Sequence, residues 1–387
     1  MNTPPIYLDH QATTPLDERV LEAMLPFLTS EYGNPSSPHA CGRSAASAIR
    51  TARRQVTDLI GAKNELEIVF TSGATEANHL AVVGAALAAR PTGGHIVTTA
   101  IEHKAVLAAC RRLVDHHGYT LTRVGVDAHG RVRPADIAAV LTPNTVLVSV
   151  MHANNEIGTL QRLAAVAEIT AQRGIVLHSD AAQSVGCGLL DVAELGVDLA
   201  SLSAHKLHGP KGIGALYIRG GTRIVAQQTG GGQESGLRAG TPNVPAIVGF
   251  GAAAHLITTG AVPPPTRIRA LRDRLQDRLL AAIPGTTVNG HPCRRLPGNL
   301  SLTLPGIEAT DLLDRLPGIA ASTGSACNTG SGEPSHVLTA IGLTPGQARA
   351  TLRLSIGRTT TDADIDQAAD LITHTSHTLM RTPANAP

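Results

Sequence analysis

The stretch "SLSAHKLHGPKGIGALY" (Ser201–Tyr217) places a lysine after an apolar run and between two histidines, and a Gly-Pro-Lys-Gly turn follows it. The apolar runs on both sides of the turn are typical of two buried strands. A lone lysine at a strand end commonly extends to solvent. A partly desolvated lysine among polar groups can instead form a Schiff base, so the neighbours of Lys206 decide between the two interpretations.

Further apolar runs occur on both sides of this stretch. Between about residues 66 and 220 they are "LEIVFTS", "GGHIVTTA", "NTVLVSVMHAN", "GIVLHSDAAQ", "DLASLSAH" and "GALYI". Segments with helical periodicity separate them, such as "EANHLAVVGAALAAR" and "LAAVAEITAQRG". The alternation predicts an α/β fold with a mostly parallel sheet and helices on both of its faces.

Polar residues gather at the ends of these predicted strands. They are Thr71 and Ser72, Glu102 and His103, Asn154 and Asn155, Asp180 and Gln183, and Ser203, His205 and Lys206. In sheets of this kind, ligands bind beyond the carboxyl ends of the strands. The sequence therefore predicts one binding site built from these strand ends.

A proline cluster, residues 263–265, marks a domain boundary. The helix after it has apolar residues at helical spacing, from Ile268 to Leu279. The strand-like "PGNLSLTLPG" and "ARATLRLSIGR" and the helical "EATDLLDRL" and "DADIDQAADLITHTSHTL" follow. We expect a large domain over residues 15–260 and a smaller α+β domain that combines residues 1–14 with 261–387.

Composition excludes several classes of protein. The net charge is +2 and no long basic run occurs, so we expect neither direct nucleic-acid binding nor membrane binding. The N-terminus lacks the pattern of a secretory signal, which favours the cytoplasm. The five cysteines include no CxxC pair, which argues against a disulfide framework and a zinc knuckle. The histidines form no convincing metal site either.

The strand ends offer the groups that pyridoxal phosphate requires, namely a lysine and a carboxylate beside the pyridine nitrogen. Asp180 ends the run "GIVLHSD", one strand–helix–strand unit before Lys206. The stretch "FTSGATEANHLA" reads as a strand, a glycine turn and a helix start, where the backbone at Ala74 and Thr75 can hold a phosphate. Ser203 and His205 are further donors, and His103 can stack on the ring and transfer protons.

Nine motifs in order make the chain resemble the cysteine desulfurases. They are "YGNPSSPHACG", "TSGATEAN", "EHKAVL", "NNEIGTLQ", "HSDAAQ", "SAHKLHGPKGIGALY", "GGGQESGLRAGTPN", "STGSACNTGSGEPSHVL" and "LRLSIG". The resemblance covers nearly the whole chain, from "YLDHQATTP" to "RLSIGR". It implies pyridoxal phosphate as cofactor, a type I fold of the aspartate-aminotransferase kind with a seven-stranded sheet, and membership of the group with a long active-site loop.

The resemblance also implies a role for each matching residue. Lys206 would carry the cofactor, Asp180 would pair with its ring nitrogen, and His103 would stack on the ring. Asn154 and Gln183 would contact the 3-oxygen region, and Ala74, Thr75, Ser203 and His205 would hold the phosphate. Thr241 would reach the phosphate of the other subunit, which implies a homodimer. Asn34 and Arg353 would bind the substrate carboxylate.

Cys327 would be the nucleophile, because its loop "STGSACNTGSGEPSH" is polar and suited to reach a substrate sulfur. We interpret the other cysteines as core residues; they are Cys41, Cys110, Cys187 and Cys293. The implied reaction converts L-cysteine to L-alanine and places the sulfur on Cys327 as a persulfide. The sulfur of the persulfide would pass to an acceptor protein. Through its persulfide, Cys327 could also be a transient ligand of an iron–sulfur cluster.

The destination of the sulfur stays open at this point. Iron–sulfur cluster assembly and thiolation of tRNA or cofactors are the expected uses in this family. A desulfurase dedicated to sulfur modification of DNA, a selenocysteine lyase, an aminotransferase and a catalytically silent scaffold are the alternatives. The intact set of Lys206, Asp180 and Cys327 argues against the scaffold.

Overall fold

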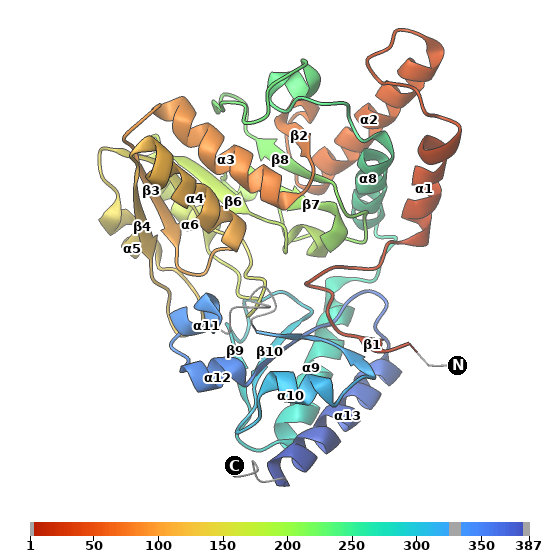
Figure 1. Cartoon of the computed structure of the whole chain (residues 1–387), viewed down its shortest axis with the longest axis vertical. Helices are drawn as coiled ribbons and strands as arrows, with labels where there is room; N and C mark the ends of the chain where they lie inside the picture. The colour runs from red at the N-terminus through yellow and green to blue at the C-terminus, as the bar shows by residue number, and fades with distance from the viewer. Residues whose placement is uncertain (1–3, 325–333, 382–387) are drawn as a thin grey trace.

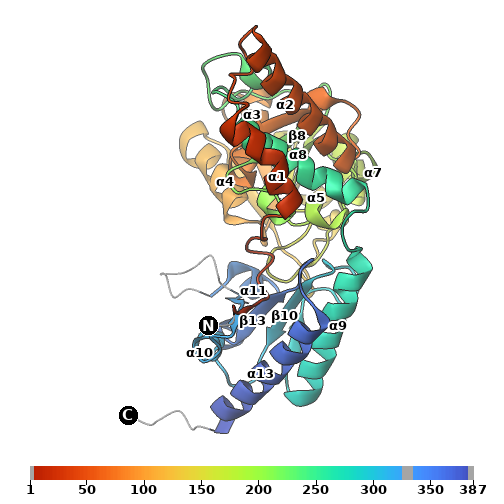
Figure 2. The ribbon, with the colours of Figure 1, turned by 90° about the vertical axis from the view of Figure 1, so that its right-hand side faces the viewer.

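The computed structural model describes residues 4–324 and 334–381. It contains a large unit built on one central sheet and a smaller unit built on a second sheet (Figure 1). The N-terminal segment runs from the small unit up to α1 on the large unit, as both views show (Figures 1 and 2).

The central sheet has seven strands, and the predicted α/β class is confirmed. In spatial order they are β2 (Ile68–Thr71), β8 (Gly214–Ile218), β7 (Leu199–Ser203), β6 (Val176–Asp180), β5 (Thr145–Ser149), β3 (His95–Thr99) and β4 (Thr120–Val124). Only β8 runs against its neighbours, so the sheet is mostly parallel. The carboxyl ends of the other six strands therefore meet at one edge of the sheet.

Helices cover both faces of this sheet. Successive side chains of a strand point to opposite faces, so neighbouring strand residues belong to different hydrophobic cores. Val97 and Val148 belong to the core under α1, α2, α5, α6, α7 and α8, whereas Ile96 and Leu147 belong to the core under α3 and α4. The bounds are α1 (Glu18–Thr29), α2 (Ala40–Leu59), α3 (Ala74–Ala89), α4 (Lys104–His117), α5 (Pro134–Val140), α6 (Leu163–Ala171), α7 (Val192–Leu195) and α8 (Val244–Thr258). Short 3-10 turns occur at η1 (Glu65–Glu67), η2 (Val185–Cys187), η3 (Ala204–Lys206) and η4 (Gln233–Gly236).

The smaller unit is built on an antiparallel sheet with the order β12 (Ser322–Thr323), β13 (Thr351–Ser355), β10 (Asn299–Thr303) and β9 (Thr287–Asn289). Beside it, β1 (Ile6–Tyr7) pairs in parallel with β11 (Ile319–Ala320). Its helices are α9 (Pro265–Ala282), α10 (Ala309–Asp314), α11 (His336–Ala340), α12 (Pro345–Arg349) and α13 (Asp362–Arg381). The strands and helices that the sequence predicts after the proline cluster are thus confirmed.

This unit has a hydrophobic core of its own. The core joins Leu8 from the N-terminal segment to buried residues of α9, β10, β13 and α13. Its composition supports the predicted union of residues 1–14 with the C-terminal part, although the boundaries at 14 and 261 stay predictions. Within residues 4–324 and 334–381, no helix has the length and apolar character needed to cross a membrane.

Candidate active site

A cavity of about 590 Å³ lies at the carboxyl ends of the central strands. It brings together most of the site residues that the sequence predicts, namely Ala74, Thr75, His103, Asp180, Gln183, Ser203, His205, Lys206 and Arg353. These residues come from both units, because Arg353 lies on β13 of the small one. The expected convergence of Asp180 and Lys206 on one cavity is therefore confirmed.

Asp180 is the last residue of β6, and both of its oxygens are held in place. Oδ1 accepts a hydrogen bond of 3.0 Å from the backbone N–H of Ala182. Oδ2 accepts one of 2.6 Å from the side-chain amide of Asn78, a fully buried residue of α3. The carboxylate thus has one fixed orientation at the cavity wall. Sequence reasoning missed Asn78, although it stands in the quoted motif "TSGATEAN".

Lys206 lies at the end of η3, directly after β7. Its Nζ donates hydrogen bonds of 2.5 Å to the carbonyl of Gln11 and 2.7 Å to the carbonyl of Ala12. The side-chain amide of Gln183 donates to the same Gln11 carbonyl at 3.1 Å. Backbone oxygens of the N-terminal segment therefore hold the amine at the cavity wall.

The N-terminal segment 9–14 forms one wall of the site, which sequence reasoning did not predict. Besides the carbonyls that hold Lys206, Thr13 Oγ1 lies 3.1 Å from Nδ1 of His205, and Thr14 Oγ1 donates to the His205 carbonyl at 3.0 Å. The signal was present, because these residues stand in the motif "YLDHQATTP". The sequence of this motif alone does not indicate which strand end its residues contact.

The start of α3 forms another part of the cavity wall. Gly73 is its N-cap and supplies no side-chain hydrogen bond, so the first backbone N–H groups at Ala74 and Thr75 face the cavity region without a side-chain cap. Gly214 on β8 approaches this turn closely, since a Cβ there would lie 2.7 Å from Gly73 Cα. The positive end of the helix dipole and free N–H groups suit a phosphate.

His205 adds a neutral donor or acceptor to the same region. Burial, followed by the positive charges of Lys206 and Lys211, lowers the pKa of His205 to about 4. Lys211 also lines the cavity and was not predicted as a site residue. The positive charge near the helix start thus comes from lysines and not from this histidine.

His103 is the N-cap of α4 and lines the cavity. Its Nδ1 accepts a hydrogen bond of 3.2 Å from the backbone N–H of Ala105. The neutral imidazole therefore carries its proton on Nε2. A ring held in this way keeps one orientation and one tautomer.

Arg353 is only 3% exposed, yet it lines the cavity. Nη2 donates to Asp9 Oδ1 at 2.8 Å and Nη1 donates to the carbonyl of Asn155 at 3.1 Å, while Nε has no partner among the described residues. Asp9 also accepts a hydrogen bond from Ser322. The guanidinium is thus oriented by the carboxylate of Asp9, which the sequence analysis did not single out, and by the backbone carbonyl of Asn155.

Three predicted residues do not line the cavity. Asn154 is fully buried: its Oδ1 accepts from the N–H groups of Glu156 and Ile157 and its amide donates to the Ile101 carbonyl, so it holds the turn after β5. Its neighbour Asn155 lines the cavity in its place, which corrects the expected contact. Asn34 and Thr241 are exposed and do not reach the cavity from this chain. Cys327 lies outside the described residues.

The other four cysteines are free, and they differ in exposure. Cys110 is buried, and burial together with the charge of Glu102 raises its pKa to about 12. Cys41 and Cys293 are exposed, so their interpretation as core residues is wrong. Both lie outside the strand-rich stretches from which the core was predicted.

The described residues fit pyridoxal phosphate. The uncapped start of α3 suits the phosphate, the fixed carboxylate of Asp180 suits a protonated ring nitrogen, and Lys206 supplies an amine in the same cavity. His103 offers an aromatic ring with a fixed tautomer. The cavity volume lies within the range of about 300–1,000 Å³ that is usual for small-molecule sites.

Comparison with known proteins agrees with this chemistry. The family model of the class-V aminotransferases matches residues 6–368. The cysteine desulfurase IscS of Anaeromyxobacter sp. (strain Fw109-5) is 46% identical over 371 residues, which cover 95% of this chain and 91% of that protein. A solved NifS-like protein is 35% identical, with a TM-score of 0.88 and coverage of 97% of this chain and 99% of that one. The structure of SspA in complex with cysteine is 36% identical, with a TM-score of 0.80 and coverage of 92% and 99%. Enzymes of this family depend on pyridoxal phosphate, and the chain belongs to the cysteine desulfurases of the class-V aminotransferase family.

Proposed function

We propose that this protein binds pyridoxal phosphate and uses it to remove sulfur from L-cysteine. The observation that carries the proposal is the single cavity shared by Asp180, Lys206, His103 and Arg353. The similarity to SspA in complex with cysteine supports the choice of substrate. When bound, pyridoxal phosphate supplies an electron sink that stabilises negative charge at the substrate Cα.

Each cofactor contact has a proposed role. Ala74, Thr75, Ser203 and His205 hold the phosphate, and Asp180, fixed by Asn78 and Ala182, keeps the ring nitrogen protonated. His103 stacks on the ring. Gln183 and Asn155 line the same cavity and contact the 3-oxygen region.

The positive charge that we propose for substrate binding comes from Arg353 on β13 of the small unit. Arg353 binds the carboxylate of cysteine through its planar fork, whose orientation Asp9 sets. Lys206 moves the proton at the substrate Cα, because its Nζ lies at the cavity wall and not at the surface. Asn34 and Thr241 do not reach the cavity of their own chain, so we assign them to the shared sites of a homodimer.

The sulfur transfer itself is assigned to Cys327. Its thiolate attacks the sulfur of cysteine, an S–S bond forms and the C–S bond breaks. The electron pair of the C–S bond stays with the carbon fragment, which takes up a proton and leaves as alanine. The enzyme keeps the sulfur as a persulfide and passes it to an acceptor protein in the cytoplasm, for iron–sulfur cluster assembly or thiolation.

The test is turnover by the purified protein with added pyridoxal phosphate and L-cysteine. We expect alanine and, with an added thiol reductant, sulfide in equal amounts. Lys206→Ala should abolish both products, whereas the exposed Lys63→Ala should change neither. Alanine formation that persists in Lys206→Ala, or the absence of alanine from the wild type, would contradict the proposal.

A further inference from the structure

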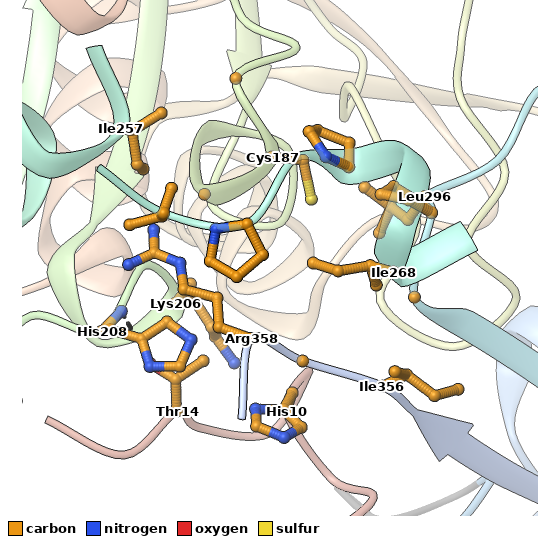
Figure 3. Close-up of a pocket in the computed structure, with 18 of the residues that line it drawn as sticks. His10, Thr14, Cys187, Lys206, His208, Ile257, Ile268, Leu296, Ile356 and Arg358 are labelled. Atoms are coloured by element: carbon orange, nitrogen blue, oxygen red, sulfur yellow. Dashed lines mark hydrogen bonds between the residues drawn. The ribbon is translucent and has the colours of Figure 1, made fainter. Parts of the chain in front are cut away.

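A second cavity of about 590 Å³ lies between the two units, behind Lys206 (Figure 3). Its walls come from the N-terminal segment, from the end of α8 and the start of α9, and from the chain after β13. In Figure 3 the polar side chains of Arg358, His208 and Lys206 lie on one side, and Ile268, Leu296 and Ile356 lie on the other. The cavity is thus amphipathic, and its main body is separate from the candidate active site.

Several buried polar atoms around this cavity have no hydrogen-bond partner among the described residues. They are Nη1 and Nη2 of Arg358, both ring nitrogens of His10 and Nε2 of Gln11. His10 and Gln11 are only 6% and 8% exposed. The carbonyl of Tyr7 lies near enough to affect the pKa of His10, but it makes no hydrogen bond of normal geometry with the ring. Such atoms are rare in folded proteins, because each one costs about 1–3 kcal/mol.

Among the described residues, no carboxylate accepts a hydrogen bond from either Nη of Arg358. Asp17 is the carboxylate whose charge acts on the pKa of Arg358, and it is engaged in an ion pair of 2.8 Å with Arg19. Cys187 also lines the cavity, but burial raises its pKa to about 11, so the thiol is neutral at pH 7. The guanidinium therefore presents both Nη groups, which are donors only, without a bonded acceptor.

We propose that this cavity binds a small organic carboxylate with an apolar chain. The carboxylate accepts hydrogen bonds from Arg358, and the chain packs against Ile268, Leu296 and Ile356. Gln11 and His10 also line the cavity and offer further donors. A ligand with a terminal hydroxyl or keto oxygen satisfies these groups as well and binds more tightly than a simple fatty acid.

The position of the cavity connects the ligand to catalysis. Gln11, Gln183 and Lys206 border both cavities, and the Gln11 carbonyl accepts hydrogen bonds from the other two. A bound carboxylate would fix the N-terminal segment against the small unit. A ligand in this cavity would thus lie against the wall that holds the reactive amine. Its binding can be measured without turnover.

The experiment is calorimetric titration of the holoenzyme with hexanoate, 6-hydroxyhexanoate, hexylamine and sulfate. We expect one site for hexanoate, tighter binding of 6-hydroxyhexanoate, and no binding of hexylamine or sulfate. Arg358→Met should weaken hexanoate binding about tenfold or more, because it removes charged hydrogen bonds. Val262→Trp places a large side chain in the cavity from a loop and should also weaken hexanoate binding. This second variant keeps the test valid if Arg358→Met fails to fold.

Arg353→Gln is the matched control, since it removes the arginine of the other cavity. Hexanoate binding should be unchanged in this variant. Loss of binding in Arg353→Gln with retention in Arg358→Met would place the ligand in the active-site cavity and overturn the inference. The inference also fails if hexanoate shows no saturable binding, or if sulfate binds as well as hexanoate does.

Discussion

Asn78 Nδ2 lies 2.6 Å from Asp180 Oδ2, which joins the interior of α3 to the carboxyl end of β6. The same helix presents its uncapped N-terminus to the cavity. One helix therefore orients the carboxylate proposed for the ring nitrogen and supplies the backbone groups proposed for the phosphate. α3 therefore links the phosphate end of the proposed cofactor site to its ring-nitrogen end.

Substitution of Asn78 tests this arrangement. Asn78→Ala leaves a buried carboxylate oxygen of Asp180 without its donor, which costs about 1–3 kcal/mol. We expect weaker cofactor binding and a kcat/KM about tenfold lower, measured by cofactor titration and alanine formation. Asn78→Asp places a second carboxylate against Asp180 and should be more damaging. Asn144→Ala, on an exposed loop, should behave like the wild type. An equal loss of cofactor affinity and kcat/KM in this control would show that the effect does not depend on the contact between Asn78 and Asp180.

Arg353 offers a second test, of substrate binding. Its two Nη groups are already oriented by Asp9 and the Asn155 carbonyl. A lysine keeps the charge but loses the planar fork, so Arg353→Lys should raise KM for cysteine about tenfold or more with a smaller effect on kcat. Steady-state kinetics of alanine formation measures this split. Arg349→Lys is the control, because this arginine is exposed and pairs with Glu308; an unchanged KM in Arg353→Lys would place the carboxylate elsewhere.

Cys327 is the proposed nucleophile, and its substitution separates cofactor binding from sulfur transfer. Cys327→Ala should keep the visible absorbance of the bound cofactor, because none of the proposed cofactor contacts includes Cys327. It should release no sulfide from cysteine. Cys293→Ala removes an exposed cysteine of the small unit and should retain full activity. Full sulfide production by Cys327→Ala would refute the assignment.

Much of the central sheet could be predicted because its strands are buried on both faces and read as continuous apolar runs. β4 (Thr120–Val124) is the strand that the quoted runs do not include, since it lies at the edge of the sheet and is mostly exposed or half-buried. Its polar "TLTRV" sequence lacks the signal of a central strand. The antiparallel direction of β8 was likewise not readable, because direction depends on the turn after Lys206 and not on composition.

Only part of the candidate site could be predicted from the sequence. Residues at strand ends could be found because strand ends of a parallel sheet share one edge. The choice between Asn154 and Asn155 could not be made, since it depends on which side chain the turn after β5 uses for its own hydrogen bonds. The contacts of segment 9–14 with Lys206 and His205 join positions about 190 residues apart, and local patterns carry no information on such pairs.

Gly214 tests whether close approach of β8 shapes the phosphate site. A Cβ at this position would lie 2.5 Å from the Leu202 carbonyl and 2.7 Å from Gly73 Cα, so Gly214→Ala must displace backbone. We expect a loss of about 1–3 kcal/mol in stability and weaker cofactor binding, measured by chemical denaturation and cofactor titration. Gly346→Ala should do neither, because a Cβ there meets nothing within 4 Å. A Gly214→Ala variant with normal cofactor affinity would show that the turn tolerates displacement.

His178 makes a prediction about pH and stability. Its ring is fully buried on β6, with Nδ1 2.8 Å from Ser149 Oγ and Nε2 3.0 Å from Ser201 Oγ. Burial lowers the pKa of His178 to about 4, so the folded protein keeps this ring neutral. In the unfolded chain the histidine takes up a proton below about pH 6.5, which stabilises the unfolded state.

The contribution of His178 is therefore full above about pH 6.5 and is lost as the pH falls toward 4. Comparison with His178→Gln isolates this residue from the other buried histidines. Between pH 7 and pH 4 the wild type should lose about 3 kcal/mol more of its free energy of unfolding than the variant does. Denaturant titrations at several pH values measure the difference. Parallel pH curves for the two proteins would mean that His178 titrates alike in the folded and unfolded chains, and that burial on β6 does not hold the ring neutral.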